Sequence, residues 1–140
     1  MTCRIQPALC RGIALCGLLS LLAGCGSGGQ TSVESFHPQA DDAREALTIA
    51  LTAWQKGQAE PGEIKDAELA VQASDSTWKS GAKLKSFEIA EEAAGTGPRK
   101  FKVKLTLDGV AAPKEVNYIV VGKEPLQVMS EDEYNRDSGM

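Results

Sequence analysis

The first 25 residues determine how much of this chain is available for folding. Arg4 and Arg11 give the start a positive charge, and residues 13–23 form an apolar core of eleven residues that ends in small side chains. Such a core is too short for a membrane crossing, which needs roughly 20 apolar residues. The pattern is typical of a secretory signal that is removed after export. We therefore expect residues 1–24 to be absent from the mature protein.

This signal ends in the four residues Leu22-Ala23-Gly24-Cys25. The segment resembles the lipobox of bacterial lipoproteins. The resemblance implies cleavage between Gly24 and Cys25 and attachment of a lipid, with acyl chains such as palmitate, to the Cys25 thiol. Two or more acyl chains give stable membrane attachment, because each buried methylene contributes about 0.8 kcal/mol. By resemblance to enterobacterial sorting, Gly26 after the cysteine favours a cell-envelope location at the periplasmic face of the outer membrane.

Processing changes what the composition implies. Removal of residues 1–24 from the 140-residue chain leaves 116 residues, enough for one compact domain and too few for two ordinary ones. The removed part carries two arginines and no acid, so the net charge changes from −4 to −6, which argues against nucleic-acid binding. Three of the four cysteines leave with it, so no disulfide can form within the mature chain. The hydrophobic core must therefore hold the domain together.

Residues 25–40 are expected to form a flexible tether to the lipid anchor. The glycine- and serine-rich run after Cys25 suits a flexible coil and cannot build a core. The only histidine of the chain, His37, lies in this tether beside Pro38. We interpret it as a solvent-exposed loop residue, because a metal site normally needs several ligands on rigid elements. The sequence thus indicates neither a metal site nor another cofactor.

A helix is predicted to begin at Asp42, which can cap the first turn together with Glu45. Apolar residues then recur at helical spacing on one face as far as Trp54, and Gly57 ends the helix. Residues 64–73 fit a helix and a strand about equally. We favour a short extended piece after a turn for this segment.

From residue 83 onward the apolar residues recur with the period of two that is typical of strands. Four strands are predicted, around Phe87 and Ile89, over residues 101–107, over residues 115–121 and over residues 126–130. The short turns between them favour an antiparallel meander. The polar tail, residues 132–140, is expected to fray.

One helix followed by four antiparallel strands predicts an α+β domain over residues 41–131, with the N-terminal helix packed on one face of a bent sheet. This order resembles the cystatin-like and NTF2-like superfamily. Small uncharacterised lipoproteins of planctomycete-type bacteria are similar over residues 43–130, in the strings Trp54-Gln-Lys-Gly57, Asp75-Ser-Thr-Trp78-Lys-Ser-Gly81-Ala-Lys-Leu84 and Phe87-Glu-Ile89. These motifs are structural, so the resemblance implies a fold and no activity.

Trp54, Asp75 and Trp78 are the candidate pocket residues, because NTF2-like enzymes often place an acid and an aromatic ring between helix and sheet. The simpler interpretation is that Asp75 caps a turn and the two rings fill the core, since no titratable partner for the acid is evident. Because the only histidine, His37, lies in the tether, no Ser-His or Cys-His pair can be assembled from the mature domain. We therefore expect a non-catalytic binding or structural module, with an NTF2-like small-ligand-binding protein or enzyme as the alternative.

Lys100, Lys102 and Lys104 alternate with apolar residues on the strongest predicted strand. They could form a basic face for anionic lipid headgroups or for an acidic protein partner in the envelope. A solvated sheet face is the favoured interpretation, because strand lysines also discourage edge-to-edge aggregation.

Overall fold

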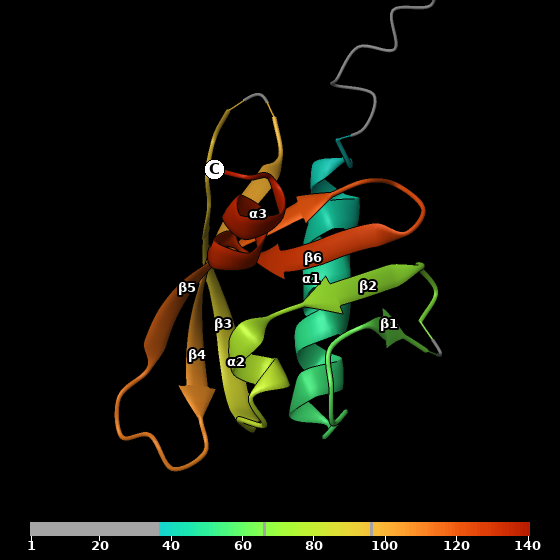
Figure 1. The fold of residues 1–140 in the computed structure, drawn as a ribbon. Helices are drawn as coiled ribbons and strands as arrows, with labels where there is room; N and C mark the ends of the chain where they lie inside the picture. Colours follow the sequence, from blue (N-terminus) through green and yellow to red (C-terminus); the bar gives the residue numbers. More distant parts are fainter. Residues whose placement is uncertain (1–36, 66, 96) are drawn as a thin grey trace, which may run out of the picture. The chain divides into compact units, whose positions relative to one another are not determined.

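The computed structural model describes residues 37–140 except residues 66 and 96 (Figure 1). The expected α+β class is confirmed for this part of the chain. Its elements are α1 (Ala40–Gln55), β1 (Glu63–Ile64), β2 (Val71–Ser74), α2 (Ser76–Lys79), β3 (Leu84–Glu92), β4 (Arg99–Leu107), β5 (Lys114–Val121), β6 (Leu126–Ser130) and α3 (Glu131–Asp137). The predictions for the signal peptide, Gly24 and Cys25 lie outside the described residues.

The sheet has the order β1-β2-β6-β5-β4-β3. Strands β3 to β6 are the four predicted strands, and each pairs antiparallel with the next. The observed sheet is nevertheless larger than the predicted four-stranded antiparallel one. Strand β2 pairs in parallel with the edge of β6, and β1 pairs antiparallel with β2. The ambiguous segment, residues 64–73, supplies Ile64 of β1 and the first three residues of β2, which agrees with the extended piece favoured for it. The described sheet is therefore six-stranded and mixed.

Helix α1 packs its apolar face against this sheet. Six of its residues are buried: Ala43, Ala46, Leu47, Ala50, Leu51 and Trp54. The helix begins two residues earlier than predicted, at Ala40, with Gln39 at the N-cap position and no capping side chain, so the capping role expected for Asp42 is wrong. Asp42 instead lies in the first turn, where its charge is favourable near the positive end of the helix dipole. The predicted helix end is confirmed, since the Gly57 N–H donates to the Trp54 carbonyl at 3.0 Å.

The last residues of the predicted tether belong to the folded part. Pro38 is buried, and its carbonyl accepts a hydrogen bond of 3.3 Å from Nε of Arg99 on β4. His37 is half-buried rather than solvent-exposed as predicted. The expectation of a flexible coil therefore does not hold at this end, because β4 fixes the chain just before α1.

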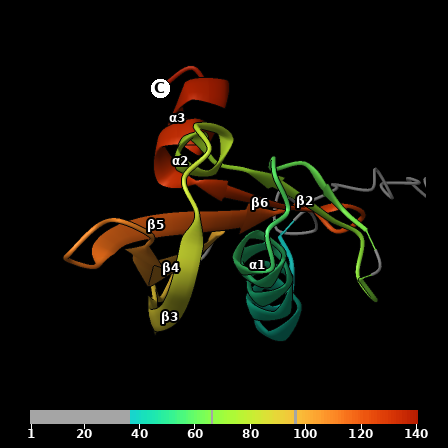
Figure 2. The same cartoon turned by 90° about the horizontal axis from the view of Figure 1, so that it is seen from below.

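Helix α3 replaces the frayed tail that the polar composition predicts. Figure 2 shows it on the side of β5 and β6 that faces away from α1. On that side Ile119 and Met129, which are paired across β5 and β6, are 4% and 6% exposed. The helix has three acids in its first turn and Arg136 in its last, which suits its dipole. The short helix escapes prediction because it carries no apolar periodicity.

The main core lies between α1 and the opposite face of the sheet. Strand β4 contributes Phe101, Val103 and Leu105, each 0% exposed, which confirms the predicted alternation along this strand. Tyr118 and Val120 of β5 face the same way and are buried as well. The two tryptophans, Trp54 and Trp78, belong to the same core.

Candidate functional site

Trp54 and Trp78 stack on each other within the core. Their ring centroids are 5.3 Å apart and their planes differ by 7°. Nε1 of Trp54 donates to the carbonyl of Ala82 at 2.8 Å, and Nε1 of Trp78 donates to the carbonyl of Gln58 at 2.8 Å. Each tryptophan is 2% exposed. The rings therefore serve as core packing whose polar atoms are already bonded.

Asp75 lies between β2 and α2 and is 5% exposed. Its Oδ1 accepts a hydrogen bond of 2.9 Å from the backbone N–H of Trp78, which caps α2. Its Oδ2 accepts a hydrogen bond of 2.6 Å from the hydroxyl of Tyr118. The predicted capping role is confirmed, and α2 forms because this carboxylate bonds the orphan N–H of its first turn.

Tyr118 is a site residue that the sequence-based prediction missed. It lies on β5, and its hydroxyl donates to Asp75, which directly follows the last residue of β2. Burial, the negative charge of Asp75 and the hydrogen bond to it raise the pKa of Tyr118 well above its usual value. The predicted alternation of β5 already turns Tyr118 inward, and a buried tyrosine hydroxyl normally has a hydrogen-bond partner. The need for such a partner is the feature of the sequence that could have indicated Tyr118 as a site residue.

Ser130, the last residue of β6, is paired with Tyr118 in the sheet register. It is 5% exposed, and its Oγ has no hydrogen-bond partner among the described residues. Although Ser130 occupies the N-cap position of α3, its side chain makes no capping bond. A buried hydroxyl without a hydrogen-bond partner is uncommon in proteins.

Asp75 and Ser130 line the same cavity, which we call the Asp75 pocket. Its volume is about 240 Å³. Its lining is Asp75, Ser76, Thr77, Lys114, Glu115, Val116, Asn117, Ser130, Glu131 and Asp132. Four of these residues are acids and one is a lysine. The lining is therefore polar and carries an excess of negative charge.

Glu131 is held at the rim of the Asp75 pocket by partners on two strands. It accepts hydrogen bonds from Nζ of Lys100 and, at 2.8 Å, from Nδ2 of Asn117. These bonds lower the pKa of Glu131 below its usual value, the bond from Lys100 more than that from Asn117. Glu131 is thus already paired, whereas the described ion pairs do not include Asp75, Glu115 or Asp132.

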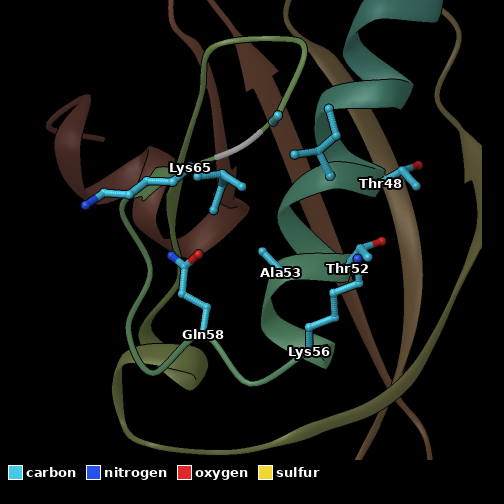
Figure 3. A pocket seen from close by; sticks show the side chains of 9 residues that line it. Thr48, Thr52, Ala53, Lys56, Gln58 and Lys65 are labelled. Atoms are coloured by element: carbon cyan, nitrogen blue, oxygen red, sulfur yellow. The ribbon is translucent and has the colours of Figure 1, made fainter.

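Two other cavities border α1. One, of about 470 Å³, has Ala53 of α1 on one side and Gln58 and Lys65 of the following segment on the other (Figure 3). The second, of about 610 Å³, is lined in part by Trp54, Lys83 and Asp108. Neither of these cavities is lined by Trp78 or Asp75. The structure thus brings the three predicted pocket residues together, but none of the four cavities found among the described residues is lined by all three.

The lysine row of β4 does not make a uniformly basic face. Lys100 pairs with Glu131, and Nζ of Lys102 lies 3.6 Å from a carboxylate oxygen of Glu91. Lys104 stands in register between Glu88 on β3 and Glu115 on β5. Opposite charges across strands stabilise a sheet, so this surface is a mixed-charge face.

Within the described residues, no group of three histidine, cysteine, aspartate or glutamate side chains converges to hold a metal ion. None of the helices in that part of the chain combines the length and the apolar character that a membrane crossing requires. No protein-family model matches the chain, and searches among curated proteins and solved structures found no significant match.

Proposed function

We propose that this chain is a lipid-anchored lipoprotein of the bacterial cell envelope and that its folded domain is a non-catalytic binding or structural module. The observation that carries the proposal is the segment Leu22-Ala23-Gly24-Cys25 directly after an eleven-residue apolar core. In this proposal the signal is cut between Gly24 and Cys25. The acylated Cys25 then holds the domain at the periplasmic face of the outer membrane.

The hydrogen bonds of Asp75 support a role without catalysis. A general acid or base has to exchange a proton with a substrate, and its site must leave the carboxylate free to do so. Both oxygens of Asp75 accept bonds from within the domain, one from the N–H of Trp78 and one from the hydroxyl of Tyr118. Asp75 is therefore better suited to hold α2 and β5 in place and to act as a fixed acceptor than to transfer protons.

A relation to the cystatin-like and NTF2-like superfamily is part of the proposal. It is supported by the long helix α1 on one face of the consecutive antiparallel strands β3 to β6. The parallel pairing of β2 with β6 departs from the simple meander. Small-ligand binding is the second candidate function, and the Asp75 pocket is the observation that favours it.

Membrane flotation of cell lysates tests the proposed anchor. The natural chain and a Cys10→Ser control, changed within the signal but away from the cleavage point, should float with membrane vesicles. Cys25→Ser should lose this attachment, because no thiol remains to carry the lipid. A Cys25→Ser chain that is trimmed at the same position and still floats would rule the anchor out.

A further inference from the structure

Helix α3 covers two apolar residues of the sheet without burying any residue of its own. Ile119 and Met129, which lie on the side of the sheet that α3 covers (Figure 2), are 4% and 6% exposed. None of the seven residues of α3 is buried. Isolated helices shorter than about 12 residues are marginal in water, so α3 depends on its attachment to the sheet.

The side-chain attachment of α3 to the sheet passes through one carboxylate. Glu131 accepts hydrogen bonds from Nζ of Lys100 on β4 and from Nδ2 of Asn117 on β5. Within the described residues, the other side-chain bonds of α3 join Arg136 to Glu133 inside the helix. The side chains of Lys100 and Glu131 are 41% and 31% exposed, so solvent reaches this pair and weakens it.

Ser130, the residue between β6 and α3, favours release of the helix. It occupies the N-cap position, but its side chain makes no capping bond. Its Oγ is buried and has no hydrogen-bond partner in the part of the chain that the structure describes. A buried hydroxyl without a partner is costly, and contact with water after opening would remove that cost. The closed position of α3 is therefore strained at the point where the helix joins the sheet.

We propose that α3 is a releasable cover over the apolar strip formed by Ile119 and Met129, that Glu131 holds it closed and that it opens at Ser130. Acid is one condition that should open it. The bonds from Lys100 and Asn117 lower the pKa of Glu131 in the closed state. Their contribution to closure is fully present above the ordinary glutamate pKa of about 4.3 and declines as the pH falls through the lower pKa of the closed state. The cover does not depend on the proposed lipid anchor.

The other charged groups around α3 make no bond between this helix and the sheet. Strand β6 carries none. The charged residues that share a cavity with Glu131 are Asp75 before α2, Lys114 and Glu115 on β5, and Asp132 on α3 itself. A neighbouring cavity brings Lys79 of α2 close to Glu133 and Arg136. Protonation of these acids would break no side-chain bond between α3 and a strand, so the charge of Glu131 controls the cover.

The test is the oxidation of Met129 by hydrogen peroxide in the full chain, followed by mass spectrometry of its peptides. Met140 is 82% exposed and gives a reference rate in the same sample. Because Met129 reacts only when it is uncovered, the ratio of the two rates reports the open fraction. This ratio should rise about twofold or more between neutral pH and about pH 3.5. A ratio that does not change with pH would overturn the proposal.

Glu131→Gln removes the charge at neutral pH and so separates this residue from other effects of acid. It should raise the oxidation ratio about threefold or more, and the ratio should then change less with pH. Glu133→Gln is the matched control, because it changes an acid in the same helical turn that bonds only within α3. It should leave the ratio unchanged. Equal ratios for the two variants would overturn the proposal.

Val103→Ala distinguishes local opening of α3 from unfolding of the whole domain. Val103 is fully buried in the main core on the opposite face of the sheet, so this variant destabilises the domain as a whole. If α3 opens locally, the oxidation ratio of Val103→Ala should stay within about twofold of that of the natural chain. A rise as large as that of Glu131→Gln would show that Met129 is uncovered by global unfolding and would overturn the proposal.

Discussion

The hydroxyl of Tyr118 donates a 2.6 Å hydrogen bond to Oδ2 of Asp75, which lies 43 residues earlier in the chain. This bond joins β5 to the N-terminus of α2 and is buried. Tyr118→Phe keeps the ring in the core but leaves a carboxylate oxygen without this donor. We expect the free energy of unfolding to fall by about 1 to 3 kcal/mol, measured by chemical denaturation.

Tyr134→Phe on α3 is the control for this substitution, because it removes the same hydroxyl from a half-buried tyrosine. It should change the free energy of unfolding by less than about 0.5 kcal/mol. Equal effects of the two substitutions would show that the bond between Tyr118 and Asp75 contributes nothing specific.

The raised pKa of Tyr118 predicts a loss of stability in alkaline solution. In the unfolded chain this hydroxyl ionises near its ordinary pKa of about 10, whereas the folded chain keeps it protonated to higher pH. The contribution to stability is therefore fully present below pH of about 10 and declines as the pH rises above that value. Denaturation measured between neutral pH and about pH 11 should show a steeper decline for the natural chain than for Tyr118→Phe. Parallel pH profiles would contradict this explanation.

Trp54→Ala should cost about 3 to 5 kcal/mol of unfolding free energy, because it removes a buried ring from the core and from its stack with Trp78. Glu45→Ala on the exposed face of α1 should have an effect of less than about 0.5 kcal/mol. The measurement is again the denaturation midpoint. A midpoint for Trp54→Ala close to that of the natural chain would mean that the ring is not buried in solution.

Gly122 and Gly109 allow backbone strain to be separated from steric conflict. Both have positive φ angles, +81° and +77°, so an alanine at either position is strained. A Cβ at Gly122 would also lie 2.9 Å from the carbonyl oxygen of Pro125, whereas a Cβ at Gly109 meets no atom within 4 Å. Each substitution should lower the free energy of unfolding by about 1 kcal/mol or more, and the loss should be larger for Gly122→Ala than for Gly109→Ala. A larger loss for Gly109→Ala would contradict the structure of the turn after β5.

The elements that the sequence predicts well are those with a strong local pattern. The alternation from Phe101 to Leu107 predicts β4, and the apolar spacing up to Trp54 predicts the buried face of α1. Both patterns report burial directly, because each residue faces either the core or the solvent. The start of α1 is less predictable. Asp42 is a suitable capping residue, yet the helix begins at Ala40, just after Pro38, whose carbonyl is bonded to Arg99 of β4.

Apart from α3, the features that escaped prediction depend on contacts between distant parts of the chain. The parallel pair of β2 and β6 joins Val71 to Leu126, and nothing in a segment as short as β2 indicates its partner. Likewise, the cap formed by Asp75 could be predicted locally, but its bond to Tyr118 could not. The Asp75 pocket exists only because the ends of β2, β5 and β6 meet, so its composition follows from the sheet order rather than from a motif.

The mass of the intact protein, extracted from membranes of the cells that produce it, tests the account most directly. The account predicts a polypeptide that begins at Cys25 and exceeds its sequence mass by a diacylglyceryl group or a larger lipid. Cys25→Ser should yield no lipid-bearing species. An unmodified chain that retains residues 1–24, or one cut at another position, would contradict the account.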